Sequence, residues 1–562
     1  MPEGTSGNVA VYAHSSEDPM AAETMVHVAE NVSFTPPPLP ERGSSQSLDE
    51  SLTRIKSALS VTVFTVPPPA PYCYWVAAMA CLNSCNLGYD VGSVGGAALL
   101  MQEEFGWSSG QLSFYIGSMN FFCIAGALNA GYVCDTFGRR RTFTISCAIF
   151  IVGILIQILS HNFAFTMFGR ILIGIGVGLG LAIDALYISE IAPPTHRGHL
   201  VSLSEVAINF GILLGFISDF AFLGVGPGWD WRLMLGLGMV MPTILVVLSL
   251  TVMPESPRWL LMQDRREEAM VVLRKTYVEG SDIEGVAAQI VQHIQADFEA
   301  DAHSSWHVIF RPTRPVQMML MAGIGLAACQ QLTGCESLIY FSPVFMEKAG
   351  FVTRNAAFGM TILVGMSKMI FCIVAVVYVD QVGRRPLLFA STGGLFVFLV
   401  VMAVACRFDS LGWLMVLGMC AYVAFFSLGV GPLTWVGTTE VFSTRIRAKA
   451  MSLATSTNRL IGGVVASTTL PLVEVLTPTG YFLFYAGVTL GTAAYLYTFF
   501  PETKGKSLEQ VEEYFEAESA KEEETKRRRR EKRGKWGMVG MGKGVGGGRA
   551  AVDGTPEQQE EE

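Results

Sequence analysis

Charged residues are scarce in this sequence. Only 15% of the 562 residues are Asp, Glu, Lys or Arg, whereas 51% are hydrophobic. A soluble globular domain with this balance would struggle to stay dissolved, since a water-facing surface needs more charge. The composition therefore indicates a chain that is surrounded by lipid.

The sequence also lacks the motifs of enzymes. It has no glycine loop for nucleotide phosphates, no cluster with metal-ligand spacing and no nucleophile constellation. The 11 cysteines lie almost all in or beside apolar segments and show neither zinc-ligand nor paired secretory spacing, so they are interpreted as packing residues. We therefore expect no enzymatic activity, no metal and no cofactor. Acidic residues gather in the tails and in 255–311, and nothing indicates nucleic acid as a partner.

The first 70 residues lack the basic start and apolar core of a signal peptide, and 1–70 is predicted to be a disordered cytoplasmic tail. Long apolar runs follow. About 20 apolar residues in a helix cross a bilayer core of roughly 30 Å. Twelve transmembrane helices are predicted at 72–93, 112–134, 143–160, 163–188, 199–222, 233–253, 317–345, 357–379, 386–406, 412–438, 449–473 and 480–500.

Basic residues in the short loops indicate the orientation of these helices, because Lys and Arg favour the cytoplasmic side. Loops on one side of the membrane hold nine of them, and loops on the other side hold three. Both termini are therefore predicted to be cytoplasmic. The expected location is the plasma membrane, with an internal membrane as the alternative.

The chain repeats itself. Gly138-Arg139-Arg140 returns as Gly383-Arg384-Arg385, and Pro254-Glu255 returns as Pro501-Glu502, at a nearly constant spacing of about 245–250 residues. Parallel repeats of this kind build carriers that expose a central site alternately to each side. The predicted domains are two six-helix bundles at 71–254 and 315–500, an intracellular helical linker at 255–314 and a cytoplasmic C-terminal tail at 501–562.

Ionisable residues inside the predicted spans point to function, because each is costly in a membrane unless it is paired or hydrated. Asp90 and Arg170 are predicted at a similar depth in the outer half. Protonation of the acid would release the arginine and shift the balance between outward-open and inward-open states. The alternative is a static ion pair that only fixes helix packing.

The second half carries a further polar set. Gln330, Gln331 and Asn458 offer amide donors and acceptors suited to hydroxyl groups, and Asn209 adds another amide. Trp435 follows the breaker Gly431-Pro432 and offers a flat apolar face to a sugar ring. Glu336, Lys368 and Arg459 add one acid and two cations around the same expected cavity, although burial alone could explain any one of them.

Acid–base pairs recur at the cytoplasmic helix ends of both halves. A network of such pairs can latch the outward-open state, although each exposed pair contributes at most about 1 kcal/mol. The alternative, charge that anchors the membrane surface, explains the arginines but not the acids. The predicted pairs are Asp135/Arg139, Glu190/Arg197, Asp380/Arg384 and Glu440/Arg447.

Five motifs in order resemble the sugar porter family of the major facilitator superfamily over about 72–515. They are Gly131-x3-Asp135-x2-Gly138-Arg139-Arg140, Pro254-Glu255-Ser256-Pro257-Arg258-Trp259, Gln330-Gln331-Leu332-Thr333-Gly334, Asp380-Gln381-Val382-Gly383-Arg384-Arg385 and Pro501-Glu502-Thr503-Lys504-Gly505. The resemblance implies an all-α membrane protein with the major facilitator fold. It also implies that Asp90 and Arg170 carry proton coupling, and that Glu205 lines the substrate cavity together with Gln330, Gln331, Glu336, Trp435 and Asn458.

Within the family, Glu205-Val206, Glu336, Lys368 and Asn458-Arg459 look most like plant polyol and monosaccharide proton symporters. We expect a proton-coupled symporter of a hexose, linear polyol or inositol that works as a monomer. Facilitative uniport and sugar sensing without flux are the alternatives.

Two further features carry alternatives. Asp184 departs from the family pattern and is expected to be a solvated vestibule residue, or else a second titrating group or substrate contact. The basic segment Lys526 to Arg533 either binds anionic lipid or belongs to a solvated, disordered tail.

Overall fold

The computed structural model describes residues 69–194, 196–303, 306–349, 353–408, 411–443, 446–506 and 508–541. The predicted N-terminal tail lies almost wholly outside these ranges. In the described part the chain is almost entirely helical, as an all-α membrane protein requires.

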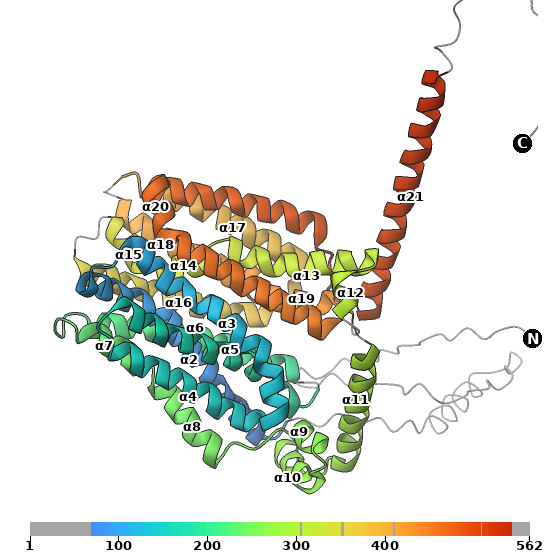
Figure 1. Ribbon diagram of the computed structural model, residues 1–562, viewed down its shortest axis with the longest axis horizontal. Helices are drawn as coiled ribbons and strands as arrows, with labels where there is room; N and C mark the ends of the chain where they lie inside the picture. Colours follow the sequence, from blue (N-terminus) through green and yellow to red (C-terminus); the bar gives the residue numbers. More distant parts are fainter. Residues whose placement is uncertain are drawn as a thin grey trace, which may run out of the picture.

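The first bundle consists of the helices that precede the linker (Figure 1). They are α2 (Pro71–Phe105), α3 (Ser109–Phe137), α4 (Arg139–Ile158), α5 (Phe163–Ile191), α6 (Arg197–Phe222), α7 (Asp230–Leu237) and α8 (Val240–Thr251). Local sequence sets several of their ends. Ser108 and Gln111 form a reciprocal capping box at the start of α3, and Asn162 caps α5.

The second bundle repeats this arrangement with more interruptions. Its helices are α13 (Arg314–Leu332), α14 (Cys335–Tyr340), α15 (Ser342–Lys348), α16 (Arg354–Val382), α17 (Arg384–Ala405), α18 (Gly412–Leu428), α19 (Val430–Val441) and α20 (Arg447–Phe499). Gly138 and Gly383 occupy the corresponding turns, at φ values of 88° and 104°. A side chain at either position would be strained, which explains why both copies of the motif carry glycine.

Ten helices in the described part are long and apolar enough to cross a membrane. One of them, Lys449–Phe499, contains two predicted spans and bends at Thr477, where φ is 63°. Helix α2 is not among the ten, and it carries the polar residues Asn83, Asn86 and Asp90. The major facilitator architecture is thus present, and the count of twelve spans stays a prediction.

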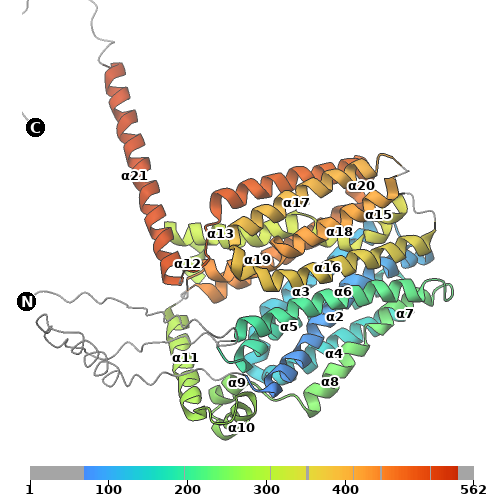
Figure 2. The same ribbon diagram turned by 180° about the vertical axis from the view of Figure 1, so that it is seen from behind.

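The two bundles pack against each other along two helix pairs, α3 with α20 and α6 with α16. Figure 2 shows α6 and α16 side by side across the boundary. Polar residues of α3 and α6 are thereby brought within reach of the second bundle, which positions the site described below.

The linker is helical and lies at one end of the bundles, together with the start of α21 (Leu508–Met541) (Figure 1). It comprises α9 (Pro257–Met262), α10 (Arg266–Thr276), α11 (Ile283–His303) and α12 (Trp306–Phe310). Helix α21 is attached to α13 by an ion pair between Arg314 and Glu522 (2.6 Å). The segment from Lys526 to Arg533 lies within α21 and is therefore helical, and its contact with lipid stays a prediction.

Candidate functional site

Asp90 on α2 and Arg170 on α5 form a buried ion pair. Arg170 Nη1 donates to Asp90 Oδ1 at 2.7 Å and to Oδ2 at 2.9 Å, and the two side chains are 5% and 0% exposed. The guanidinium also lies over the ring of Tyr115 on α3, 5.3 Å from its centroid.

The remaining nitrogens of Arg170 show how much this pair depends on the carboxylate. Nε and Nη2 are buried and donate no hydrogen bond within the described part of the chain. Asp90 is thus the carboxylate partner of a cation removed from solvent. A change in the protonation of Asp90 would alter the balance of charge at this point of the first bundle.

A second polar network centres on Glu336 and joins the two bundles. Glu336 Oε1 accepts hydrogen bonds from Gln331 Nε2 (2.8 Å) and Arg459 Nη1 (3.3 Å). Asn120 on α3 donates to Glu336 Oε2 and accepts from Arg459, at 3.3 and 3.2 Å. The break that places Glu336 is made by Gly334, whose φ of 82° suits glycine.

Three amide side chains extend this network inside the second bundle. Asn458 Nδ2 donates to Gln330 Oε1 at 2.8 Å, and Gln331 Nε2 donates to Asn458 Oδ1 at 3.2 Å. Gln330 Nε2 donates to the carbonyl of Gly431 at 2.9 Å. Trp435 lies one turn further along α19 and is partly exposed. The amides bond to one another here, and hydroxyl groups of a ligand could exchange for these bonds.

Lys368 and Glu336 contact different residues. Its buried ammonium group donates to Asn209 Oδ1 on α6, across the boundary between the bundles, and lies 6.0 Å from the ring centroid of Phe426. Asn209 Nδ2 donates to the backbone carbonyl of Glu205 at 2.7 Å. The Glu205 side chain is partly exposed.

The contacts of Asn120 were not predicted from the sequence. It touches both Glu336 and Arg459, although it belongs to the other bundle. The available signal was a fully buried amide within an apolar span, but periodicity alone does not reveal which neighbour such an amide faces.

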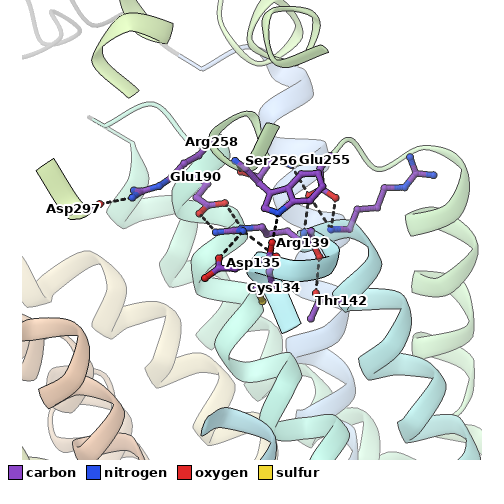
Figure 3. A network of polar contacts seen from close by, with 12 residues as sticks. Cys134, Asp135, Arg139, Thr142, Glu190, Glu255, Ser256, Arg258 and Asp297 are labelled. Carbon is purple, nitrogen blue, oxygen red and sulfur yellow. Dashed lines mark hydrogen bonds and ion pairs between the residues drawn. The ribbon is translucent and has the colours of Figure 1, made fainter. Parts of the chain in front are cut away.

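At the end of the bundles near the linker, Arg139 connects three helices (Figure 3). Its Nε and Nη2 donate to the two carboxylate oxygens of Glu190 at 2.9 and 2.8 Å, and its Nη1 donates to Asp135 Oδ1 at 3.2 Å. The predicted partner of Glu190 was Arg197. In this structure Glu190 is bonded to Arg139 instead, and the pairing with Arg197 as part of a latch stays a prediction. Arg139 takes this place because it begins α4 directly beside the end of α5.

Glu255 supports the same corner by accepting the backbone N–H groups of Arg139 (2.8 Å) and Arg140 (3.2 Å) (Figure 3). A carboxylate is favourable there, because the N-terminus of α4 carries unpaired N–H groups and a partial positive charge. Burial nevertheless raises the pKa of Glu255 above its usual value.

The second bundle repeats this corner. Arg384 Nη2 donates to Glu440 Oε1 at 2.9 Å, and Glu502 accepts the backbone N–H of Arg384 at 3.1 Å. Arg447 donates to the carbonyl of Phe442 at 3.2 Å. The side chain of Asp380, the predicted partner of Arg384, lies outside the described residues. Each of these contacts stays within one bundle, so their role as a latch between states stays a prediction.

The opposite end of the molecule joins the bundles instead. Arg354 at the start of α16 donates to Glu103 near the end of α2 at 2.9 Å, and to Glu347 at 3.3 Å. The hydrogen bonds from Arg354 lower the pKa of Glu103, so this pair persists at mildly acid pH and is lost only when the carboxyl protonates at lower pH.

Asp184 on α5 is not the solvated vestibule residue that was expected. The residue is 3% exposed and its carboxylate accepts from Asn83 and Ser84 on α2. Because α5 packs against α2, the side chain of Asp184 points into the interior of the bundle.

Comparisons with known proteins agree with this geometry. The family model "Sugar (and other) transporter" matches residues 76–515. The chain is 36% identical over 444 residues to probable polyol transporter 4 of Arabidopsis thaliana, covering 78% of this chain and 84% of the relative. It is 36% identical over 481 residues to polyol transporter 5 of the same plant, covering 81% and 88%.

Among solved structures, it resembles a partially occluded inward-open form of the xylose transporter XylE from E. coli. The TM-score is 0.67 at 27% identity, covering 78% of this chain and 100% of that one. A structure titled as the proton:xylose symporter XylE with a bound bromodeoxyglucose gives a TM-score of 0.65 at 28% identity, covering 79% and 99%. The chain therefore belongs to the sugar transporter family of the major facilitator fold.

Proposed function

We propose that this protein is a secondary active transporter that couples the entry of a proton to the entry of a polyol or monosaccharide. The observation that carries this proposal is the buried pair of Asp90 and Arg170. It stands beside a polar network that spans both bundles, in a chain whose relatives are named polyol transporters and a proton:xylose symporter.

The ion pair supplies a physical route to coupling. While Asp90 is ionised, it holds Arg170 and thereby connects α2 with α5. A proton on Asp90 weakens that attraction and leaves the guanidinium without its counter-charge, so the packing that is most stable changes. Binding of the proton is thereby converted into a bias between outward-open and inward-open states.

The amide network supplies the substrate site. Gln330, Gln331 and Asn458 can donate to and accept from neighbouring hydroxyl groups, and Glu336 offers a further acceptor. The partly exposed ring of Trp435 offers an apolar face to the carbon side of the substrate. Because Asn120 reaches Glu336 from the other bundle, occupancy of the site is connected to the approach of the two bundles.

Uptake by transporter-deficient cells tests the proposal. Labelled sorbitol, myo-inositol and glucose are offered at acid and at neutral outside pH, with and without an uncoupler. Accumulation above equilibrium that is stronger at acid pH and abolished by the uncoupler is expected. Equilibration that ignores pH and uncoupler would instead establish facilitative uniport, and substrate binding without flux would establish a sensor.

We propose that the carrier works as a monomer in the plasma membrane and that both of its termini lie in the cytoplasm. The carrier makes and breaks no covalent bond of its substrate, which is bound on one side and released unchanged on the other.

We further propose that the basic segment of α21, Lys526 to Arg533, contacts anionic lipid. Helix α21 starts beside the linker, at one end of the bundles, and extends in a different direction from the bundle helices (Figure 1). Because we place that end in the cytoplasm, the helix lies near the inner surface of the membrane. Each basic residue near such a surface contributes about 1 kcal/mol.

Replacement of the five residues from Lys526 to Arg530 by Gln should therefore remove the thermal stabilisation that phosphatidylserine gives to the detergent-solubilised carrier. Phosphatidylcholine is the neutral control. An undiminished effect of phosphatidylserine on the variant would contradict the proposal.

A further inference from the structure

Asp184 is a buried carboxylate whose hydrogen-bond partners carry no positive charge. Its Oδ1 accepts from Asn83 Nδ2 at 3.0 Å and its Oδ2 accepts from Ser84 Oγ at 2.5 Å, both on α2. Neither donor is charged. The residue is 3% exposed, so water provides little compensation for a charge at this position.

The groups that face Asp184 from neighbouring helices do not supply a counter-ion. Its titratable neighbours are the thiols of Cys81 on α2 and Cys147 on α4. Helices α3 and α6 also pack on α5, and within the described residues no Lys, Arg or His forms an ion pair with Asp184. The cations nearest along α5 and its neighbours are already paired, Arg170 with Asp90 and Arg139 with Glu190.

A small cavity adjoins this carboxylate. It is lined by Asp184, Asn83, Asn86, Ser146 and Gly176 among others, and its volume of about 10 Å³ is of the size needed for a single water molecule. Asn86 Oδ1 is buried and accepts no hydrogen bond in the described part of the chain. An unpaired acceptor beside a water-sized space that is partly lined by polar groups indicates a place for a water molecule, which can carry a proton.

The local backbone is adapted to this arrangement. Gly180 on α5 lies against Asn83, and a Cβ there would come within 2.3 Å of Asn83 Nδ2. Glycine at this position thus allows Asn83 to sit on the α5 backbone and to reach the carboxylate one turn further along.

We propose that Asp184 is a second proton-binding site of the carrier, on the cytoplasmic side of Asp90, and that it receives the proton that Asp90 releases. A carboxyl group without a counter-ion in this setting is far more stable when neutral than when ionised. The carboxyl keeps its contact with Ser84 when protonated, because its own O–H can then donate to the hydroxyl oxygen. Because Asp184 is protonated at rest, it first loses its own proton to water on the cytoplasmic side. The O–H bond on Asp90 then breaks and a new O–H bond forms on Asp184, so the transfer leaves Asp90 ionised and Asp184 neutral.

The position of Asp184 fits this transfer, which rests on the proposed proton coupling. Ser84 precedes Asp90 by six residues on α2, a rise of about 9 Å, and α2 runs outward. Asn86 and its cavity lie between the two levels. Asp184 in turn precedes Glu190 by six residues on α5, so it stands between the coupling pair and the cytoplasmic ion pairs.

Infrared difference spectroscopy of the full-length carrier in nanodiscs tests whether Asp184 holds a proton. The measurement is made in choline salts, without substrate or gradient, and therefore does not depend on coupled transport. We expect a protonated-carboxyl C=O band at neutral pH that is absent from Asp184→Asn and shifted in Ser84→Ala. Asp219→Asn is the matched control, since Asp219 is another buried acid, and its substitution should leave the Asp184 band in place.

The transfer itself is tested by substrate-driven proton entry into proteoliposomes that contain a pH dye. We expect Asp184→Asn to slow proton entry at least several-fold while substrate still binds. Proton binding at Asp184 would be overturned if Asp184→Asn kept every protonated-carboxyl band of the unsubstituted carrier. Unchanged proton entry in Asp184→Asn would overturn the transfer even where the band is found.

Discussion

Asp90→Asn is expected to abolish accumulation of substrate against its gradient, while exchange of labelled for unlabelled substrate across the membrane continues. Asparagine has nearly the shape of aspartate, but its amide group cannot take up and release a proton between acid and neutral pH. The substitution also leaves Arg170 buried without a carboxylate, which fixes the carrier in the arrangement that protonation would favour. Measurement of accumulation and of counterflow in proteoliposomes separates the two activities.

Asp90→Glu is the control for this prediction, because it keeps a titratable carboxyl and should keep part of the pH-driven uptake. Retained binding of substrate shows that the Asn variant is folded. If Asp90→Asn still accumulates substrate under a proton gradient, the ion pair has only a packing role and coupling must reside elsewhere.

The approach of Asp90 to Arg170 could be predicted from the sequence, because depth in a helical span follows directly from residue number. Each residue adds about 1.5 Å along the axis, so two charges on opposite-running spans can be placed at the same level without any knowledge of packing. The repeated motifs likewise predict two bundles and the turns at Gly138 and Gly383.

Side-chain contacts and burial that depend on how a helix is rotated about its own axis could not be predicted in this way. Glu190 pairs with Arg139 because α4 begins beside the end of α5, a contact between segments that sequence spacing does not report. Asp184 is buried because α5 turns this face toward α2, whereas its number alone fits a vestibule equally well. Breaks at Gly334 and Phe341 divide the single span expected at 317–345 into three helices, and the break at Gly334 gives Glu336 its direction.

Arg139→Met should be the most destabilising single change at the corner formed by Arg139, Glu190 and Glu255. The side chains of Arg139 and Glu190 are 4% and 3% exposed, and their bidentate contact compensates both charges. Removal of the guanidinium leaves the Glu190 carboxylate buried without a counter-ion, a loss that typically costs about 3–5 kcal/mol of folding free energy. Thermal unfolding in detergent, followed by the change in midpoint, measures the effect.

The repeat supplies a matched control for this prediction. Arg384→Met breaks the corresponding contact with Glu440, where the two side chains are 11% and 27% exposed, so water compensates part of the remaining charge and a smaller loss is expected. The double change Arg139→Met with Glu190→Leu should recover much of the loss, because it removes both charges together. Equal losses in the two single variants would contradict burial as the cause, since the two corners differ in exposure far more than in geometry.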